Sequence, residues 1–200
     1  PDKMIGYLTR YAPGRRENGG VYSHAAAWAI WAFSKLKMAD KAFEVYRKLS
    51  PVYNGLNPDE YKAEPFVMPG NIDGPDSPNY GMAGWTWYTG SASWLQKVIV
   101  DWILGIRASS EGLIIDPCIP KEWEKFSAKR KFRGAEYQIT VYNDEGVFSG
   151  VQCIKVNGSL QDSNVIIPQK SKNNEVEVFL GKTIPAKREQ PLAATTKNTK

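Results

Sequence analysis

One short loop gathers side chains that suit the recognition of sugars or carboxylates. Residues 15–20, with the sequence RRENGG, place two guanidinium groups, a carboxylate and an amide beside two glycines. Such groups hydrogen-bond sugar hydroxyls and carboxylates well. The loop therefore predicts a polar ligand site, and the simpler alternative is a solvated loop with an internal ion pair.

Two further stretches suit the binding of an anion. His24 is the one histidine of the chain, and it stands at the start of a predicted helix, where its ring can donate to an anion. Thr89, Gly90 and Ser91 open a strongly apolar helix, whose free N–H groups and dipole favour an anion. Gly90 permits close approach to the backbone, and Thr89 adds a hydroxyl donor. The alternatives are a packed histidine and a simple helix cap formed by Thr89 or Ser91.

Aromatic residues gather just before this apolar helix. Flat rings beside polar groups can stack on the apolar faces of sugars. Trp85 and Tyr88 precede the helix and are the better pocket candidates, whereas Trp94 belongs to the apolar stripe and is expected in the core.

Helical spacing in the first half predicts the elements that position these groups. We expect a helix over residues 24–37, capped by Ser23 and buried because Trp28 and Trp31 make it apolar around most of its girth. A second helix should start with Asp40 as its N-cap and end at Pro51.

A long turn-rich segment separates these helices from a third one. Residues 51–84 are rich in Pro, Gly and Asn, and irregular segments of this length are usually functional. The third helix should start at Ser91, carry one wide apolar stripe and end at Gly105.

Beyond Gly112 the pattern changes to short alternating runs separated by turn residues, which indicates strands. Helices followed by strands predict an α+β fold. We expect a helical part over residues 1–108, a β part over 109–181 and a disordered polar tail over 182–200.

Composition excludes several classes of protein. The net charge is +5, and residues 182–200 contribute five basic and one acidic residue, which leaves only +1 for the other 181. The basic run 125–134 is best explained as the solvent face of a strand, so no nucleic-acid partner is expected. No apolar run suits a membrane span, and the first residues do not resemble a signal peptide. Two cysteines and one histidine argue against a zinc site and fit reduced thiols in the cytoplasm.

Five ordered motifs resemble the C-terminal part of the inverting disaccharide phosphorylases of glycoside hydrolase family 94. The motifs span roughly residues 10–158 and read ENGGVYSH, AEPFVMPGNIDG, GWTWYTGSASW, ILGIR and GLIIDPCIP. The resemblance implies the last helices of an (α/α)₆ barrel, followed by an antiparallel β-sandwich-like domain. It also implies cleavage of a β-linked disaccharide by inorganic phosphate, which yields an α-sugar 1-phosphate.

The resemblance assigns roles to particular residues. His24, Thr89 and Gly90 match the family's phosphate-binding residues, and Arg16 and Glu17 match positions at the acceptor sugar. A Lys is expected at the position of Arg16 in cellobiose phosphorylases, so Arg16 favours cellobionic acid, whose carboxylate suits an arginine fork.

The family's general acid, an aspartate, is expected upstream of this chain, so no catalytic residue is assigned here. The resemblance therefore implies an inactive fragment of a longer cytoplasmic enzyme, commonly a homodimer. Phosphate is itself a substrate, and no metal or organic cofactor is implied.

Other functions remain open. The chain could belong to a cyclic β-glucan synthase, or to a hydrolase that shares the helical barrel. It could also be a degenerate remnant, or a non-catalytic carbohydrate-binding module that uses Trp123 and Tyr137.

Overall fold

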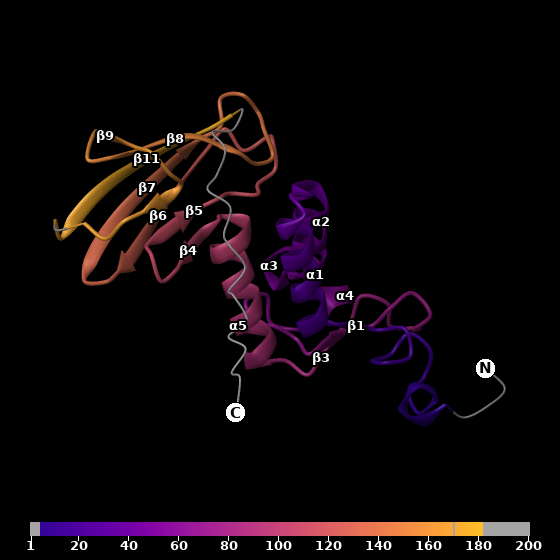
Figure 1. Cartoon of the computed structure of the whole chain (residues 1–200). Helices are drawn as coiled ribbons and strands as arrows, with labels where there is room; N and C mark the ends of the chain where they lie inside the picture. The colour runs from indigo at the N-terminus through magenta and orange to yellow at the C-terminus, as the bar shows by residue number, and fades with distance from the viewer. Residues whose placement is uncertain (1–4, 170, 182–200) are drawn as a thin grey trace, which may run out of the picture.

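The computed structural model describes residues 5–169 and 171–181, and the predicted tail 182–200 lies outside the described residues. The first half of the chain is mainly helical and the second half is built of strands (Figure 1). This mixed content confirms the α+β class. None of the helices found in the described ranges is long and apolar enough to cross a membrane.

The helical part is built around α1, which packs against both α2 and α5. The helices are α1 (Ser23–Lys35), α2 (Ala39–Leu49), α3 (Pro51–Asn54), α4 (Pro58–Tyr61) and α5 (Thr89–Val98), with a 3-10 turn η1 (Gly6–Thr9) and a π-helical turn η2 (Ile99–Ile103) that continues α5. All three long helices were predicted, and Gly105 follows η2 with a left-handed φ of 69°, as its C-terminal role requires.

Two predicted helix caps are wrong. Tyr22 is the N-cap of α1, and Ser23 is its buried first residue, whose Oγ has no hydrogen-bond partner in the described part of the chain. The Ser23 amide instead donates to the carbonyl of Gly70, so backbone pairing guides the chain into α1. Asp40 lies in the first turn of α2, whose N-cap is Met38. In that turn its negative charge interacts favourably with the positive end of the helix dipole.

The predicted burial of α1 holds for one face. Ala27 and Ile30 are fully buried, whereas Trp28 is 49% exposed and Trp31 is half-buried. Trp28 stands one residue after the buried Ala27, about 100° around the helix, and so lies on a different face.

The turn-rich segment 51–84 is more regular than expected. It contains α3 and α4, and it supplies two strands of a small antiparallel sheet. In this sheet β2 (Asn71–Ile72) lies between β1 (Val21–Tyr22) and β3 (Ala83–Gly84). The sheet brings residues 71–84 beside the start of α1, which positions the site described below.

The second half folds into two sheets. The strands are β4 (Ile106–Ala108), β5 (Leu113–Ile115), β6 (Lys125–Phe132), β7 (Ala135–Tyr142), β8 (Val151–Val156), β9 (Ser159–Gln161), β10 (Val165–Ile166) and β11 (Asn173–Leu180). One sheet has the order β10-β5-β4 and the other β6-β7-β11-β8-β9. The pairing is antiparallel throughout except between β7 and β11, which run parallel and so depart from the predicted antiparallel arrangement. Alternate residues of β6 are exposed, so Lys125, Lys129 and Lys131 of the basic run lie on the outer face of a strand, as predicted, whereas Arg130 lies on the other, partly buried face.

The inner face of the larger sheet forms a core. Tyr137, Ile139 and Val141 have no exposed surface, and the Tyr137 hydroxyl accepts a hydrogen bond from the amide of Gln169 at 3.1 Å. Tyr137 therefore cannot contact a glycan, and the binding-module hypothesis loses one of its two proposed aromatic residues.

Cys118 should be unreactive in the folded protein. Its side chain is 1% exposed, and burial raises the pKa of its thiol to about 11. The reactive thiolate is therefore nearly absent at pH 8. We expect Ellman's reagent to modify Cys118 at pH 8 only after denaturation. A Cys153→Ser variant isolates this signal, and rapid modification of that folded variant would contradict the prediction.

Candidate functional site

Arg16 and Glu17 lie at the tip of a tight turn. The amide of Asn18 donates to the carbonyl of Arg15 at 2.9 Å, and Arg16, the second residue of the turn, has a left-handed φ of 47°. A non-glycine residue in this region is uncommon and costs conformational energy. Arg16 Nε lies 3.8 Å from Glu17 Oε2. The predicted internal ion pair is therefore present, but the two charged groups are too far apart for a good hydrogen bond.

The guanidinium of Arg16 is held between aromatic rings. Its Cζ lies 4.2 Å from the ring centroid of Trp85 and 5.2 Å from that of Tyr11. Trp85 itself has a left-handed φ of 56°, so both members of the closer pair adopt a strained backbone. Stacking of this kind fixes the plane of a guanidinium and leaves its N–H edge available for a ligand.

Arg16 and Glu17 open onto a cavity of about 160 Å³. The cavity is lined by residues from the 15–20 loop, from β1 and β2 and from the segment after β3: Arg16, Glu17, Gly20, Tyr22, Gly70, Asn71, Trp85 and Tyr88. Its wall thus combines a cation, a carboxylate, an amide and three aromatic rings, a combination that suits a polar ligand such as a sugar. Both predicted pocket residues, Trp85 and Tyr88, line it.

Two tyrosines on the cavity wall connect it to the anion site. Tyr22 and Tyr88 both line the cavity. Tyr22 is two residues before His24, and Tyr88 is the N-cap of α5, directly before Thr89. The polar cavity and the start of α5 are therefore neighbouring parts of one site.

His24 lies against the N-terminus of α5. A Cβ placed on Gly90 would lie 3.7 Å from both Nδ1 and Cε1 of the imidazole. Thr89 and Gly90 are exposed, and the helix has no side-chain cap. The hydroxyl of Ser91 donates instead to the carbonyl of Tyr88 at 2.9 Å, so the cap alternative for Thr89 and Ser91 is wrong.

Aromatic neighbours hold the imidazole in place. The ring centroid of His24 lies 5.0 Å from that of Trp28, in an edge-on arrangement, and 6.0 Å from those of Tyr22 and Trp94. Nε2 of His24 is buried and has no hydrogen-bond partner among the described residues. A histidine packed only as a core residue would normally have this nitrogen satisfied. The edge of the imidazole that carries Nδ1 faces Gly90, so this edge and the helix N–H groups can meet one anion.

The structure brings together all five predicted site residues, in two adjoining groups. Trp87, which is close to Trp85 and Tyr88 in the sequence, does not line the cavity. Its indole N–H instead donates to Glu64 at 3.1 Å. Tyr11, Tyr22 and Asn71 were not predicted as site residues. No local pattern marks them, since they join the site through the β1–β2–β3 sheet and the turn before it.

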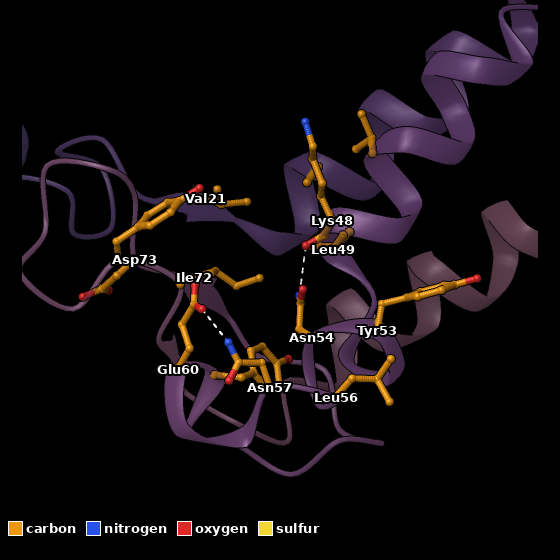
Figure 2. Close-up of a pocket in the computed structure, with 15 residues that line it drawn as sticks. Val21, Lys48, Leu49, Tyr53, Asn54, Leu56, Asn57, Glu60, Ile72 and Asp73 are labelled. Carbon is orange, nitrogen blue, oxygen red and sulfur yellow. Dashed lines mark hydrogen bonds between the residues drawn. The ribbon is translucent and has the colours of Figure 1, made fainter.

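A second, larger cavity of about 540 Å³ is lined by residues of α1, α2 and the α3–α4 segment (Figure 2). Its walls are mostly apolar, and hydrogen bonds from Asn54 to the carbonyl of Lys48 (2.9 Å) and from Asn57 to Glu60 (2.7 Å) join residues that line it. Tyr61 is 2% exposed, and burial raises its pKa to about 12. None of the predicted site residues lines this cavity.

Comparisons with known proteins match two successive stretches of the chain to two family models. Residues 1–105 match the family model of the glycosyl hydrolase 94 superfamily, catalytic domain, and residues 106–151 match that of glycosyl hydrolase family 65, C-terminal domain. An N,N'-diacetylchitobiose phosphorylase of Vibrio furnissii is 41% identical over 182 residues, which are 90% of this chain and 22% of that protein.

Two other relatives have names that describe different activities. The cyclic beta-(1,2)-glucan synthase NdvB of Rhizobium meliloti is 41% identical over 158 residues, which are 78% of this chain and 6% of that protein. A cellobionic acid phosphorylase of Neurospora crassa is 29% identical over 141 residues, which are 68% of this chain and 18% of that protein.

The chain spans about a fifth of the length of the phosphorylases that it matches, which are 41% and 29% identical to it. The catalytic-domain model covers more than half of the chain and includes every residue of the site described above. The chain therefore belongs to the glycoside hydrolase 94 superfamily.

Proposed function

We propose that this chain is the C-terminal part of an inverting disaccharide phosphorylase, in which His24 and the start of α5 bind the phosphate. The placement of the His24 ring against Gly90, beside a cavity with Arg16 and Glu17, carries this proposal. Tyr22 and Tyr88 line this cavity, and Tyr88 directly precedes Thr89, so the proposed sugar site adjoins the proposed phosphate site, as a reaction between the two requires.

In the proposed reaction, a phosphate oxygen attacks the anomeric carbon of the donor sugar on the face opposite the leaving group. The bond from that carbon to the bridging oxygen breaks, and a general acid protonates this oxygen. The products are α-glucose 1-phosphate and the free acceptor sugar. Phosphate is the nucleophile, and we propose that no metal or organic cofactor takes part.

The general acid should lie in the part of the enzyme upstream of this chain. We propose that α1, α2 and α5 are the last helices of an (α/α)₆ barrel, and that the strands form a β-sandwich-like domain. The exposed ring of Trp28 on α1 supports the barrel, because a further helix packed there would cover it. The complete enzyme is proposed to be a cytoplasmic homodimer.

Cellobionic acid is the proposed disaccharide, in preference to cellobiose. The stacked guanidinium of Arg16 lines the cavity. Two of its N–H groups can there donate to the carboxylate of an aldonic acid. The acceptor would then be gluconate, and Glu17 would accept hydrogen bonds from its hydroxyls.

A glucan synthase is the second candidate, since NdvB is as similar to this chain as the Vibrio phosphorylase is.

The enzyme encoded by the complete reading frame should be incubated with cellobionic acid or cellobiose, with and without phosphate. We expect α-glucose 1-phosphate only when phosphate is present. Free glucose without phosphate would indicate a hydrolase, and no cleavage of either sugar would overturn the proposed function.

The 200-residue chain alone should be inactive, because it lacks the expected general acid.

A further inference from the structure

Two adjacent arginines in the loop point to different partners. Arg16 faces the cavity, whereas Arg15 does not line it. Arg15 Nε lies 3.2 Å from Oδ2 of Asp73, whose side chain is 1% exposed. The same oxygen accepts a hydrogen bond from the hydroxyl of Ser77 at 2.8 Å, and Ser77 is also buried. Asp73 is therefore a buried carboxylate whose charge is balanced by the residue next to Arg16.

The backbones of the two loops are interlocked at the same place. The amide of Gly74, directly after Asp73, donates to the carbonyl of Gly14 at 2.7 Å. A Cβ on Gly74 would overlap the carbonyl oxygen of Gly19, and one on Gly14 would overlap the backbone of Ser77. The turn that carries Arg16 thus rests directly on the segment after β2, and glycine is required on both sides of the contact.

The position of this contact is fixed by the small sheet. The amide of Asp73 donates to the carbonyl of Met82 at 2.9 Å, and its carbonyl accepts from Gly81 at 3.0 Å, which extends the β2–β3 pairing by one residue. Asp73 therefore stands on rigid backbone, while Arg16 stands on a strained turn that needs outside support.

We propose that Asp73 is a positioning residue, which acts through Arg15 to hold Arg16 and Glu17 in the geometry that binds the acceptor sugar. The inference rests on the proposed function, because the acceptor is defined by that reaction. Asp73 lies on the wall of the larger cavity and not on that of the sugar site, so it touches no substrate (Figure 2). Loss of its charge should loosen the turn and leave the phosphate site at α5 intact.

The test compares Asp73→Asn, Arg15→Ala and their double variant in the complete enzyme. The KM for gluconate and for α-glucose 1-phosphate is measured in the synthetic direction. Each single variant should raise the KM for gluconate about 10-fold, and the double variant should be no worse than either, because the two residues act as one unit. The KM for α-glucose 1-phosphate should change by less than about twofold. Asp76→Asn removes the same charge from an exposed position in the same loop and should leave both values unchanged.

A merely structural role predicts a different pattern. Equal increases in both KM values, additive effects in the double variant, or an equal effect of Asp76→Asn would each overturn the inference. Should Asp73→Asn fail to fold, Ser77→Ala removes the hydroxyl donor and keeps the carboxylate, and we then expect a rise of about threefold in the KM for gluconate alone.

A titration of tryptophan fluorescence with gluconate gives a second readout that needs no turnover. Asp73→Asn should weaken this binding by the same factor, and unaltered binding would overturn the inference. Wild-type enzyme that neither turns over nor binds gluconate would overturn the proposed function as well, whereas active wild-type enzyme with an unaffected Asp73→Asn variant would overturn only the role of Asp73.

Discussion

Replacing His24 with alanine should lower kcat/KM for phosphate about 100-fold or more in the complete enzyme. The imidazole lies against Gly90 at the start of α5, where helix N–H groups and dipole already favour an anion. Loss of one preorganised donor to a charged reacting group typically costs about 10²–10³ in rate. Steady-state phosphorolysis at varied phosphate concentration measures the effect.

Neighbouring variants make this result specific. Thr89→Val removes the exposed hydroxyl beside Gly90 and keeps the shape of the side chain, so we expect a smaller loss in the same parameter, about 10-fold. Ser23→Ala is the matched control, because Ser23 precedes His24, is buried, and has an Oγ with no partner within the described residues. An equal loss with Ser23→Ala, or an unchanged kcat/KM for phosphate with His24→Ala, would contradict the assignment of His24.

The long helices and strands could be predicted because local patterns determine them. Apolar residues repeat at helical spacing in α1 and α5, and they alternate along β7 and β11, so burial of one face selects each element. The ends were less predictable. Ser23 and Asp40 are good N-cap types, yet the pairing of Ser23 with Gly70 and the earlier start of α2 at Ala39 overrode that preference.

The small sheet could not be predicted, although it assembles the site. Its strands are two residues long, and β1 pairs with β2 across about fifty residues of chain, as in the pairing of Val21 with Ile72. Such short strands carry no period, and only tertiary structure brings them together. For this reason the contribution of Tyr22 was not predicted, whereas Arg16, Trp85 and Gly90 could be selected from their local sequence.

Arg15 and Arg16 show a further limit of sequence reasoning. Both are arginines in a flexible loop, and nothing in their local sequence separates the one that pairs with Asp73 from the one that faces the cavity. The left-handed φ of Arg16 turns consecutive side chains in different directions. Backbone geometry, which composition does not reveal, therefore decides that Arg15 pairs with Asp73 and that Arg16 faces the cavity.

Replacing Arg16 with lysine should reduce the preference for cellobionic acid over cellobiose. Lysine keeps the positive charge but loses the planar fork, and it cannot stack on Trp85 in the same way. Hydrogen bonds to a charged group contribute about 1.5–3 kcal/mol, so we expect the ratio of kcat/KM for the two disaccharides to fall about 10- to 100-fold. Activity on cellobiose should remain within about threefold of wild type, because the phosphate site is untouched.

The same measurement on Arg47→Lys provides the control, since Arg47 lies on α2, outside the sugar cavity, and stacks on Tyr53 with its Cζ 5.2 Å from the ring centroid. Its ratio should equal that of the wild type. If Arg16→Lys keeps the wild-type ratio, the guanidinium does not bind the carboxylate of the substrate. The cavity must then select its sugar through Glu17 and Asn71 instead. If the ratio falls and activity on cellobiose is retained, the stacked arginine determines the acceptor, and the strained turn that presents it is a specificity element of the enzyme.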